Sequence, residues 1–231
     1  MAPWDNSKKD RAVHPPQTNF VLSQNLPRPV AYRFLVWTMT TVVIVTGASR
    51  GIGREFAQQL ARRPSVIVYA GVRDVRCLLP DSPSLRPLQC DVTSDQSVES
   101  FYASISHLEE RVDVLINNAG IDLLLPIHDT SVADFHSILE TNLLGVHRMI
   151  KTFLPLLRNS SKIVNIGSRY ASNALNVWKE RGAYSVTSAG LNMLTTQYKN
   201  VFPDGPVIIS IHPGRVSLSP RGTDVYRSSL T

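Results

Sequence analysis

A glycine-rich turn between an apolar run and a helix-forming segment constrains the fold of this chain more than any other feature. The turn is Thr46-Gly47-Ala48-Ser49-Arg50-Gly51-Ile52-Gly53, between the β-branched run 41–45 and the helix-forming segment 54–60. Glycines let the backbone turn tightly and approach a pyrophosphate, and the following helix N-terminus offers free N–H groups and partial positive charge. The sequence therefore predicts a buried strand, a dinucleotide-binding turn and a helix.

Apolar runs and amphipathic segments alternate along the chain. The predicted strands are 41–46, 66–70, 86–90, 112–116, 162–166 and 207–211. The predicted helices are 51–62, 95–108, 131–157 and 182–200. The strands are mostly continuous in Val, Ile and Leu, which is typical of strands covered on both faces. With right-handed crossovers, this order predicts an α/β fold, a doubly wound parallel sheet with helices on both faces in a single domain.

The first 38 residues differ in composition from the rest. They are rich in Pro and polar residues and carry half of the net charge of +6. We expect 1–38 to be a disordered extension, with a targeting segment as the alternative, and 39–231 to be the dinucleotide-binding domain. The remaining charge is small, which is typical of a solvated surface rather than a nucleic-acid interface.

The cysteine positions and the hydropathy of the chain indicate whether it holds disulfides, a metal site or a membrane span. Cys77 and Cys90 belong to no Cys-x-x-Cys or Cys/His cluster, so we expect no disulfide framework and no metal. The longest apolar run, 34–45, contains threonines and is too short to span a bilayer. We expect a cytoplasmic protein with no membrane or nucleic-acid partner.

Charged residues near two strand ends bear on cofactor choice. In a dinucleotide fold, an acidic residue after the second strand would bind the ribose hydroxyl of NAD. Here Arg73 is the first charged residue after that strand, and Arg50 lies in the glycine-rich turn. Two guanidinium groups favour the 2′-phosphate of NADP. The alternative is a surface ion pair between Arg73 and Asp74.

Two further strand ends carry candidate cofactor contacts. Asp91 and Val92 follow the third strand, where a carboxylate can accept from the adenine amino group; a helix cap is the alternative. The fourth strand ends in Asn117-Asn118-Ala119-Gly120, where small residues allow the cofactor close to the backbone and the amides tie neighbouring strands. A simple turn is the alternative for this tetrapeptide.

The order and spacing of these motifs are more specific than any one of them. The set is Thr46-Gly47-x-x-x-Gly51-x-Gly53, Asp91-Val92, Asn117-Asn118-Ala119-Gly120, Asn142 within Thr141-Asn142-Leu143-Leu144-Gly145, Ser168, Tyr184 and His212-Pro213-Gly214. From about 42 to 216 the chain resembles the short-chain dehydrogenase/reductase family, and within it the small, carbonyl-reductase-like fungal and bacterial members. The resemblance implies a Rossmann-like fold, NADP as cofactor and a homo-oligomer built through 131–157 and 182–200.

The resemblance also implies a reaction, hydride transfer between NADP(H) and a small carbonyl or alcohol substrate in secondary metabolism. Family members use a Tyr as the acid, a Ser that binds the carbonyl oxygen, and an Asn that bends a helix and holds a proton-relay water. Tyr184, Ser168 and Asn142 match. Taken singly, Tyr184 is also typical of a packing aromatic, Ser168 of a helix cap and Asn142 of a kinked helix. The expected cofactor contacts are Gly47, Ser49, Arg50, Gly51, Ile52, Gly53, Arg73, Asp91, Val92, Asn118, Ala119, Gly120, Tyr184, Pro213, Gly214 and Val216.

The sequence departs from the family pattern at two places. The family has a Lys four residues after the Tyr, which binds the nicotinamide ribose and lowers the Tyr pKa; here that position is Ser188. Lys179 and Arg181 are alternative sources of charge. Leu218 replaces a Thr expected to contact the nicotinamide amide, and we expect the last strand to be missing. A catalytically impaired or non-redox dinucleotide-binding or scaffold protein is therefore the alternative function.

Overall fold

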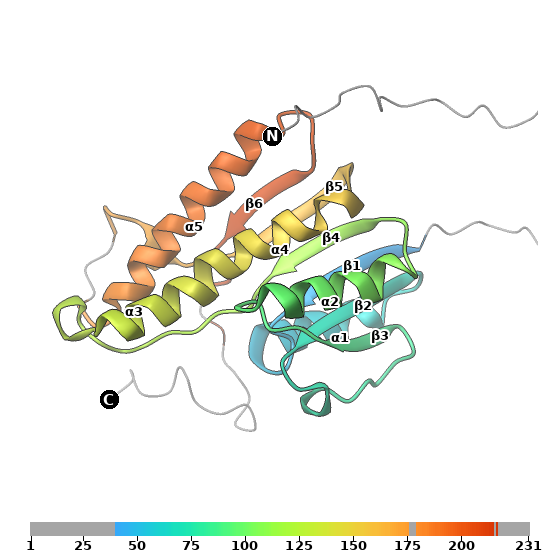
Figure 1. Cartoon of the computed structure of the whole chain (residues 1–231), viewed down its shortest axis with the longest axis horizontal. Helices are drawn as coiled ribbons and strands as arrows, with labels where there is room; N and C mark the ends of the chain where they lie inside the picture. The colour runs from blue at the N-terminus through green and yellow to red at the C-terminus, as the bar shows by residue number, and fades with distance from the viewer. Residues whose placement is uncertain (1–39, 176–178, 215, 217–231) are drawn as a thin grey trace, which may run out of the picture. The chain divides into compact units, whose positions relative to one another are not determined.

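Six parallel strands form one sheet in the order β3-β2-β1-β4-β5-β6 (Figure 1). The structure is a computed structural model and describes residues 40–175, 179–214 and 216. The strands are β1 (Thr41–Thr46), β2 (Val66–Val72), β3 (Leu85–Gln89), β4 (Val112–Asn117), β5 (Leu157–Ile166) and β6 (Val207–Ile211). The helices are α1 (Gly51–Ala61), α2 (Asp95–Ser106), α3 (Val132–Leu139), α4 (Gly145–Phe153) and α5 (Gly182–Val201). The short helical turns are η2 (Val75–Cys77), η3 (Ile127–Asp129), η4 (Glu140–Leu144), η5 (Leu154–Leu156) and η6 (Arg169–Ala171).

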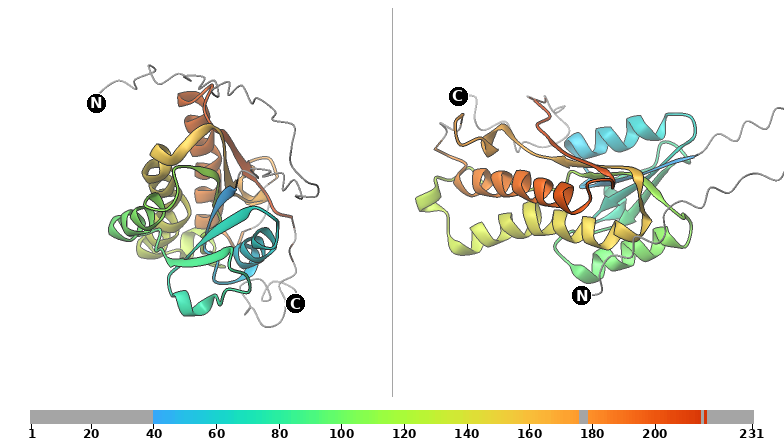
Figure 2. Two further views of the ribbon diagram at one scale, coloured as in Figure 1. Left: turned by 90° about the vertical axis from the view of Figure 1, so that its right-hand side faces the viewer. Right: turned by 90° about the horizontal axis from the view of Figure 1, so that it is seen from above.

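Helices cover both faces of the sheet, which confirms the predicted doubly wound architecture. In Figure 2 α1 lies on one face, and α2, α4 and α5 lie on the other. The alternation of side chains along β1 divides the core accordingly. Ile44 packs into the apolar cluster that includes Met149 and Phe153 of α4, whereas Val45 packs into the cluster with Ala57 of α1. The central strand β1 thus buries both of its faces, as its continuous apolar run requires.

The strand order reverses between β1 and β4. The chain runs outward from β1 through β2 to β3, returns to add β4 on the other side of β1, and continues to β6. Because all strands are parallel, their carboxyl ends lie along one edge, and the two halves diverge there. Such a reversal creates a crevice where ligands bind in open α/β sheets. Every predicted site motif follows a strand end or lies on a helix that starts at this edge.

The predicted helix 131–157 is wrong as a single element. The structure has α3, the π-helical turn η4, α4 and the short turn η5, and β5 then begins at Leu157 rather than at 162. The early part of β5 contains Ser161, whose Oγ donates to the carbonyl of Val112 at 2.6 Å and accepts from the N–H of Arg158 at 2.9 Å. A polar side chain therefore supports strand structure where the sequence suggests a turn.

Several expectations fall on residues that the structure does not describe. These are the disordered extension 1–38, the role of Leu218 and the missing last strand. Within the described ranges, none of the helices has the length and apolar character needed to cross a bilayer.

Candidate active site

The glycine-rich turn joins β1 to α1 in a conformation that requires glycine. Gly47 and Gly51 have positive φ angles of 65° and 58°. A β-carbon on Gly47 would lie 2.7 Å from the Cα of Ala119, and one on Gly53 would lie 2.5 Å from the carbonyl oxygen of Gly47. Real β-carbon contacts are not this short. The turn is therefore packed tightly against its own backbone and against the segment that follows β4.

The N-terminus of α1 is open to an anion. Arg50 is the N-cap residue, and neither its side chain nor an acidic residue in the first turn satisfies the free N–H groups of the helix. Those groups and the helix dipole favour a phosphate at this end. Ser49 and Arg50 flank the opening, so the residues present fit the pyrophosphate of a dinucleotide.

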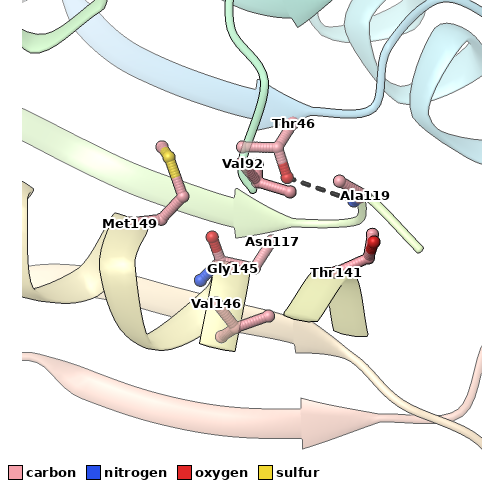
Figure 3. Close-up of a pocket in the computed structure, with 8 residues that line it drawn as sticks. All are labelled: Thr46, Val92, Asn117, Ala119, Thr141, Gly145, Val146 and Met149. Carbon is pink, nitrogen blue, oxygen red and sulfur yellow. Dashed lines mark hydrogen bonds between the residues drawn. The ribbon is translucent and has the colours of Figure 1, made fainter. Parts of the chain in front are cut away.

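A cluster of hydrogen bonds fixes the glycine-rich turn to the end of β4. Thr46 Oγ1 accepts from the backbone N–H of Asn118 at 3.0 Å and of Ala119 at 3.1 Å, the second of which Figure 3 shows. The side-chain amide of Asn118 donates to the carbonyls of Thr46 and Gly47 at 3.0 and 3.2 Å. The two loops that would hold opposite sides of a dinucleotide are thus one rigid unit.

Arg73 follows β2 at the same edge and is exposed. The alternative pairing with Asp74 is wrong, because Asp74 pairs instead with Arg76 at 2.8 Å and lies at the N-cap of η2. Arg73 makes no hydrogen bond or ion pair within the part of the chain that the structure describes. Its guanidinium is therefore available for an anionic ligand.

The residues after β3 combine a local turn with close packing on α4. Asp91 Oδ1 accepts from the N–H and the hydroxyl of Thr93 at 3.0 and 2.8 Å. Val92 is buried against Gly145, where a β-carbon would lie 2.9 Å from Val92 Cγ2. Figure 3 shows Val92 and Gly145 beside the end of β4. The alternative role of Asp91 as a helix cap is wrong, because Ser94 is the N-cap of α2 and its side chain accepts from the N–H of Ser97. An adenine contact of Asp91 stays a prediction.

Asn142 lies in the π-helical turn η4, where the backbone widens between α3 and α4. It is 8% exposed, and its side-chain amide makes two hydrogen bonds with Ile121, a residue just beyond the Asn117–Gly120 segment. Such a turn inserts one residue into a helix and changes the hydrogen bonding of nearby carbonyls. The helix is therefore irregular at Asn142, and this turn is held against the loop after β4.

Ser168 and Tyr184 are linked through Tyr170. Ser168 follows β5 and caps η6, and its Oγ accepts from the backbone N–H of Tyr170 at 3.3 Å. The ring of Tyr170 meets the ring of Tyr184 edge to face, with centroids 6.1 Å apart and an interplanar angle of 74°. The structure thus brings these two predicted residues to one region, at the start of α5.

Two polar contacts, one buried and one exposed, fix α5, which carries Tyr184, to the sheet. Asn165 of β5 donates to Thr195 at 3.0 Å and accepts from Asn117 of β4 at 2.9 Å. Asn192 accepts from the hydroxyl of Ser210 in β6 at 2.8 Å. Hydrogen-bonded amides inside an apolar core specify one alignment of helix and sheet. The position of Tyr184 is therefore set by contacts along the whole helix.

The position four residues after Tyr184 supplies no charge. Ser188 is 5% exposed and lies one helical turn along α5. Arg181 precedes Tyr184, but its guanidinium contacts the carboxylate of Asp122, and both side chains are 5% exposed. Arg181 also lies over the ring of Tyr170, 5.3 Å from its centroid. The cation nearest in sequence to Tyr184 is thus already paired with a counter-ion.

A family comparison agrees with this arrangement of motifs. The family model described as "short chain dehydrogenase" matches residues 41–226. The chain belongs to the short-chain dehydrogenase family. This is a family of oxidoreductases with a Rossmann-like fold, which confirms the predicted family and fold class.

Several known dehydrogenases and reductases are similar to this chain. Human 17-beta-hydroxysteroid dehydrogenase type 1 is 38% identical over 55% of this chain, and the match spans only 43% of the human protein. The NADP-dependent 3-hydroxy acid dehydrogenase YdfG of Salmonella typhi is 31% identical over 76% of this chain and 72% of that protein. The NADPH-bound carbonyl reductase from chicken fatty liver has a TM-score of 0.67 at 27% identity, covering 76% of this chain and 80% of that one.

The last predicted motif of this short-chain dehydrogenase follows β6. Its described residues include Pro213, Gly214 and Val216, and Gly214 has a φ of +78°. Among the described residues, no atom lies within 4 Å of the place that a β-carbon on Gly214 would take. Val216 is 42% exposed. The contact of this motif with a nicotinamide stays a prediction.

Sequence reasoning missed several residues that position the site. They include Thr46 and Tyr170, and also Asp122, the partner of Arg181. Asn165 had a visible signal, since it is an amide in the otherwise apolar run 163–166. The pair of Arg181 and Asp122 had none, because its partners come together only through the sheet.

Proposed function

We propose that this short-chain dehydrogenase is an NADP-dependent oxidoreductase that acts on a small carbonyl or alcohol substrate. The observation that carries the proposal is the linkage of Ser168 and Tyr184 through Tyr170, at the same sheet edge as the open N-terminus of α1. A hydroxyl pair beside a dinucleotide turn is suited to binding a carbonyl oxygen and protonating it.

The chain's residues fit NADP better than NAD. The N-terminus of α1 would hold the pyrophosphate, and the exposed guanidinium groups of Arg50 and Arg73 would hold the 2′-phosphate. The Salmonella relative is named as NADP-dependent and the chicken structure as NADPH-bound, which supports the same choice. When bound, NADPH supplies a hydride for the carbonyl carbon.

Ser168 and Tyr184 have complementary roles at the carbonyl oxygen. Ser168 Oγ accepts from the N–H of Tyr170, which leaves the hydroxyl hydrogen of Ser168 free to donate to the substrate oxygen. Tyr184 donates its phenolic proton as negative charge develops on that oxygen. Water near Asn142 would return a proton to Tyr184, in the role that the family assigns to this residue. In the reverse direction, Tyr184 accepts the proton of the alcohol.

Ser188 supports a second candidate function, a dinucleotide-binding protein without turnover. In the family, a Lys at this position lowers the pKa of the Tyr. The hydroxyl of Ser188 can bind a ribose but carries no charge that could do so. We therefore expect slow turnover if the chain is a reductase, and binding alone if it is not.

Titration of the purified chain with NADPH, followed by nucleotide fluorescence, tests the shared first step, with NADH as the control. Micromolar binding that prefers NADPH is the expected result, and a folded protein that binds neither nucleotide contradicts both candidates. A carbonyl-substrate screen with Tyr184→Phe then separates them. We expect Tyr184→Phe to lower turnover by about 10²-fold or more without weakening NADPH binding. The matched control is Tyr102→Phe, on α2.

The homo-oligomer that the resemblance implies is also a proposal. α5 exposes Val186 and Met193, at 52% and 59%. Exposed apolar side chains on one helix support burial against another copy. Light scattering after size-exclusion chromatography tests this, and a monomer at micromolar concentration contradicts it.

A further inference from the structure

Arg148 of α4 connects three segments of the chain at the carboxyl edge of the sheet. Its NH1 donates to the carbonyl oxygen of Val92 at 2.5 Å, and its NH2 donates to Glu140 Oε1 at 2.7 Å. Its Nε contacts the carboxylate of Asp95. The planar guanidinium presents five N–H donors in a fixed fork, which is why one side chain can bind three acceptors in different directions.

Two of these acceptors belong to the machinery of the proposed site. Val92 lies in the loop after β3, where the adenine is expected. Glu140 is the first residue of η4, the π-helical turn that carries Asn142. Gly145, the first residue of α4 directly after η4, packs against Val92 so closely that a β-carbon would not fit. A single guanidinium therefore joins the loop that would hold the cofactor to the turn that presents Asn142.

Burial and charge make this contact more than a surface ion pair. The side chain of Arg148 is 17% exposed and that of Glu140 is 22% exposed, whereas Asp95 is 78% exposed. Burial lowers the pKa of Arg148, but hydrogen bonds to Asp95 and Glu140 outweigh it and leave the pKa above its ordinary value. Truncation of Arg148 would leave the Glu140 carboxylate and the Val92 carbonyl short of a donor in a half-buried place.

We propose that Arg148 is a positioning residue that couples nucleotide binding to the presentation of Asn142. The proposal rests on the proposed function for its effect on turnover, but its structural basis does not. Without the guanidinium, the loop after β3 and the turn η4 are each held by fewer contacts. Loosening one then loosens the other, although Arg148 itself reaches neither the substrate nor the reacting atoms.

The test uses Arg148→Met, with Arg148→Lys as a milder variant and Lys151→Met as the matched control on the exposed side of α4. Hydrogen exchange followed by mass spectrometry, without nucleotide, is measured first. We expect Arg148→Met to speed exchange in both 91–98 and 138–146, and Lys151→Met to do so in neither. Arg148→Lys keeps the charge but cannot serve three acceptors, so its effect should be intermediate.

Nucleotide binding and turnover give the second readout. We expect Arg148→Met to weaken NADPH binding about tenfold and to lower kcat at saturating NADPH, since coupled sites typically influence each other by such factors. Unchanged NADPH affinity and kcat, with only a lower Tm, would overturn the proposal. Faster exchange in one segment alone would overturn it too. If the wild-type chain binds no NADPH, the proposed function fails, while hydrogen exchange still decides whether Arg148 joins the two segments.

Discussion

Asn142 binds the backbone of Ile121 with both ends of its side-chain amide. Its Oδ1 accepts from the N–H of Ile121 and its Nδ2 donates to the carbonyl of Ile121, each at 2.8 Å. The contact joins η4 to the loop after β4. Asn142 therefore has a structural role, whatever its part in the proposed proton relay.

We expect Asn142→Leu to lower the free energy of unfolding by about 2 kcal/mol, because it leaves a donor and an acceptor of Ile121 without partners. Urea unfolding followed by circular dichroism measures this. Asn200→Leu, at an exposed position near the end of α5, is the control. Equal losses in the two variants would contradict the stabilising role of the amide.

The absence of a cation at Ser188 should be partly reversible. We expect Ser188→Lys to raise kcat by about 10²-fold, because an ammonium one turn after Tyr184 lowers the Tyr pKa toward neutral pH. The measurement is the pH profile of kcat, whose alkaline limb should move to lower pH. Ser188→Met tests side-chain length without charge. A Lys variant that binds NADPH and yet turns over no faster would favour the non-redox alternative.

Arg73 should determine the preference of the chain for NADPH over NADH. We expect Arg73→Glu to weaken NADPH binding by about 10-fold to 100-fold and to leave NADH binding little changed, since only NADPH carries the 2′-phosphate. Fluorescence titration with both nucleotides measures the ratio. Arg76→Glu is the matched control, because Arg76 is nearby but pairs with Asp74. An equal effect of the two variants would point to general electrostatics instead.

The two cysteines should differ in reactivity. Burial, with a smaller effect from the charge of Asp91, raises the pKa of Cys90 from 9.0 to about 12, whereas Cys77 is exposed. At pH 8 we expect iodoacetamide to label Cys77 in the folded protein and Cys90 only after unfolding in guanidinium chloride. Mass spectrometry locates the label, and similar rates at both thiols would contradict the burial of Cys90.

The raised pKa of Cys90 also determines the direction in which the stability of the fold changes with pH. Between about pH 9 and pH 12 the unfolded chain loses the Cys90 proton and the folded chain keeps it, so stability should fall as pH rises through that range. Cys90→Ala should remove this contribution to the slope. An unchanged slope in that variant would assign the alkaline loss to other groups.

Local sequence predicts the parts of the fold that depend on local composition. The bounds of β1 and β6 are confirmed, because β1 is an uninterrupted β-branched run and β6 is an apolar run with a single Ser. The π-helical turn around Asn142 escapes such reasoning, since apolar positions recur on both sides of it and a single extra residue hardly changes their period. The result is one predicted helix, 131–157, where the structure has several elements.

The candidate site likewise contains parts that local sequence predicts and parts that it does not. The turn at Gly47 could be predicted because its conformation depends on residues that are adjacent in the sequence. The contacts of Arg148 could not, because its acceptors Val92 and Asp95 precede it by 56 and 53 positions. Only the topology of the sheet brings α4 beside the residues that follow β3. The charge pattern of α4 alone does not indicate this contact.

The position of β1 between β2 and β4 has a consequence for synthesis on the ribosome. β1, β2 and β3 emerge with α1 before β4, so one hydrogen-bonding edge of β1 stays unpaired until the chain has produced α2 and then β4. The proposed nucleotide site is incomplete during that interval, because Asn118, which follows β4, donates to the carbonyl oxygen of Gly47 in the glycine-rich turn. A nascent chain should therefore gain nucleotide affinity in one step, when β4 clears the exit tunnel, rather than gradually with length.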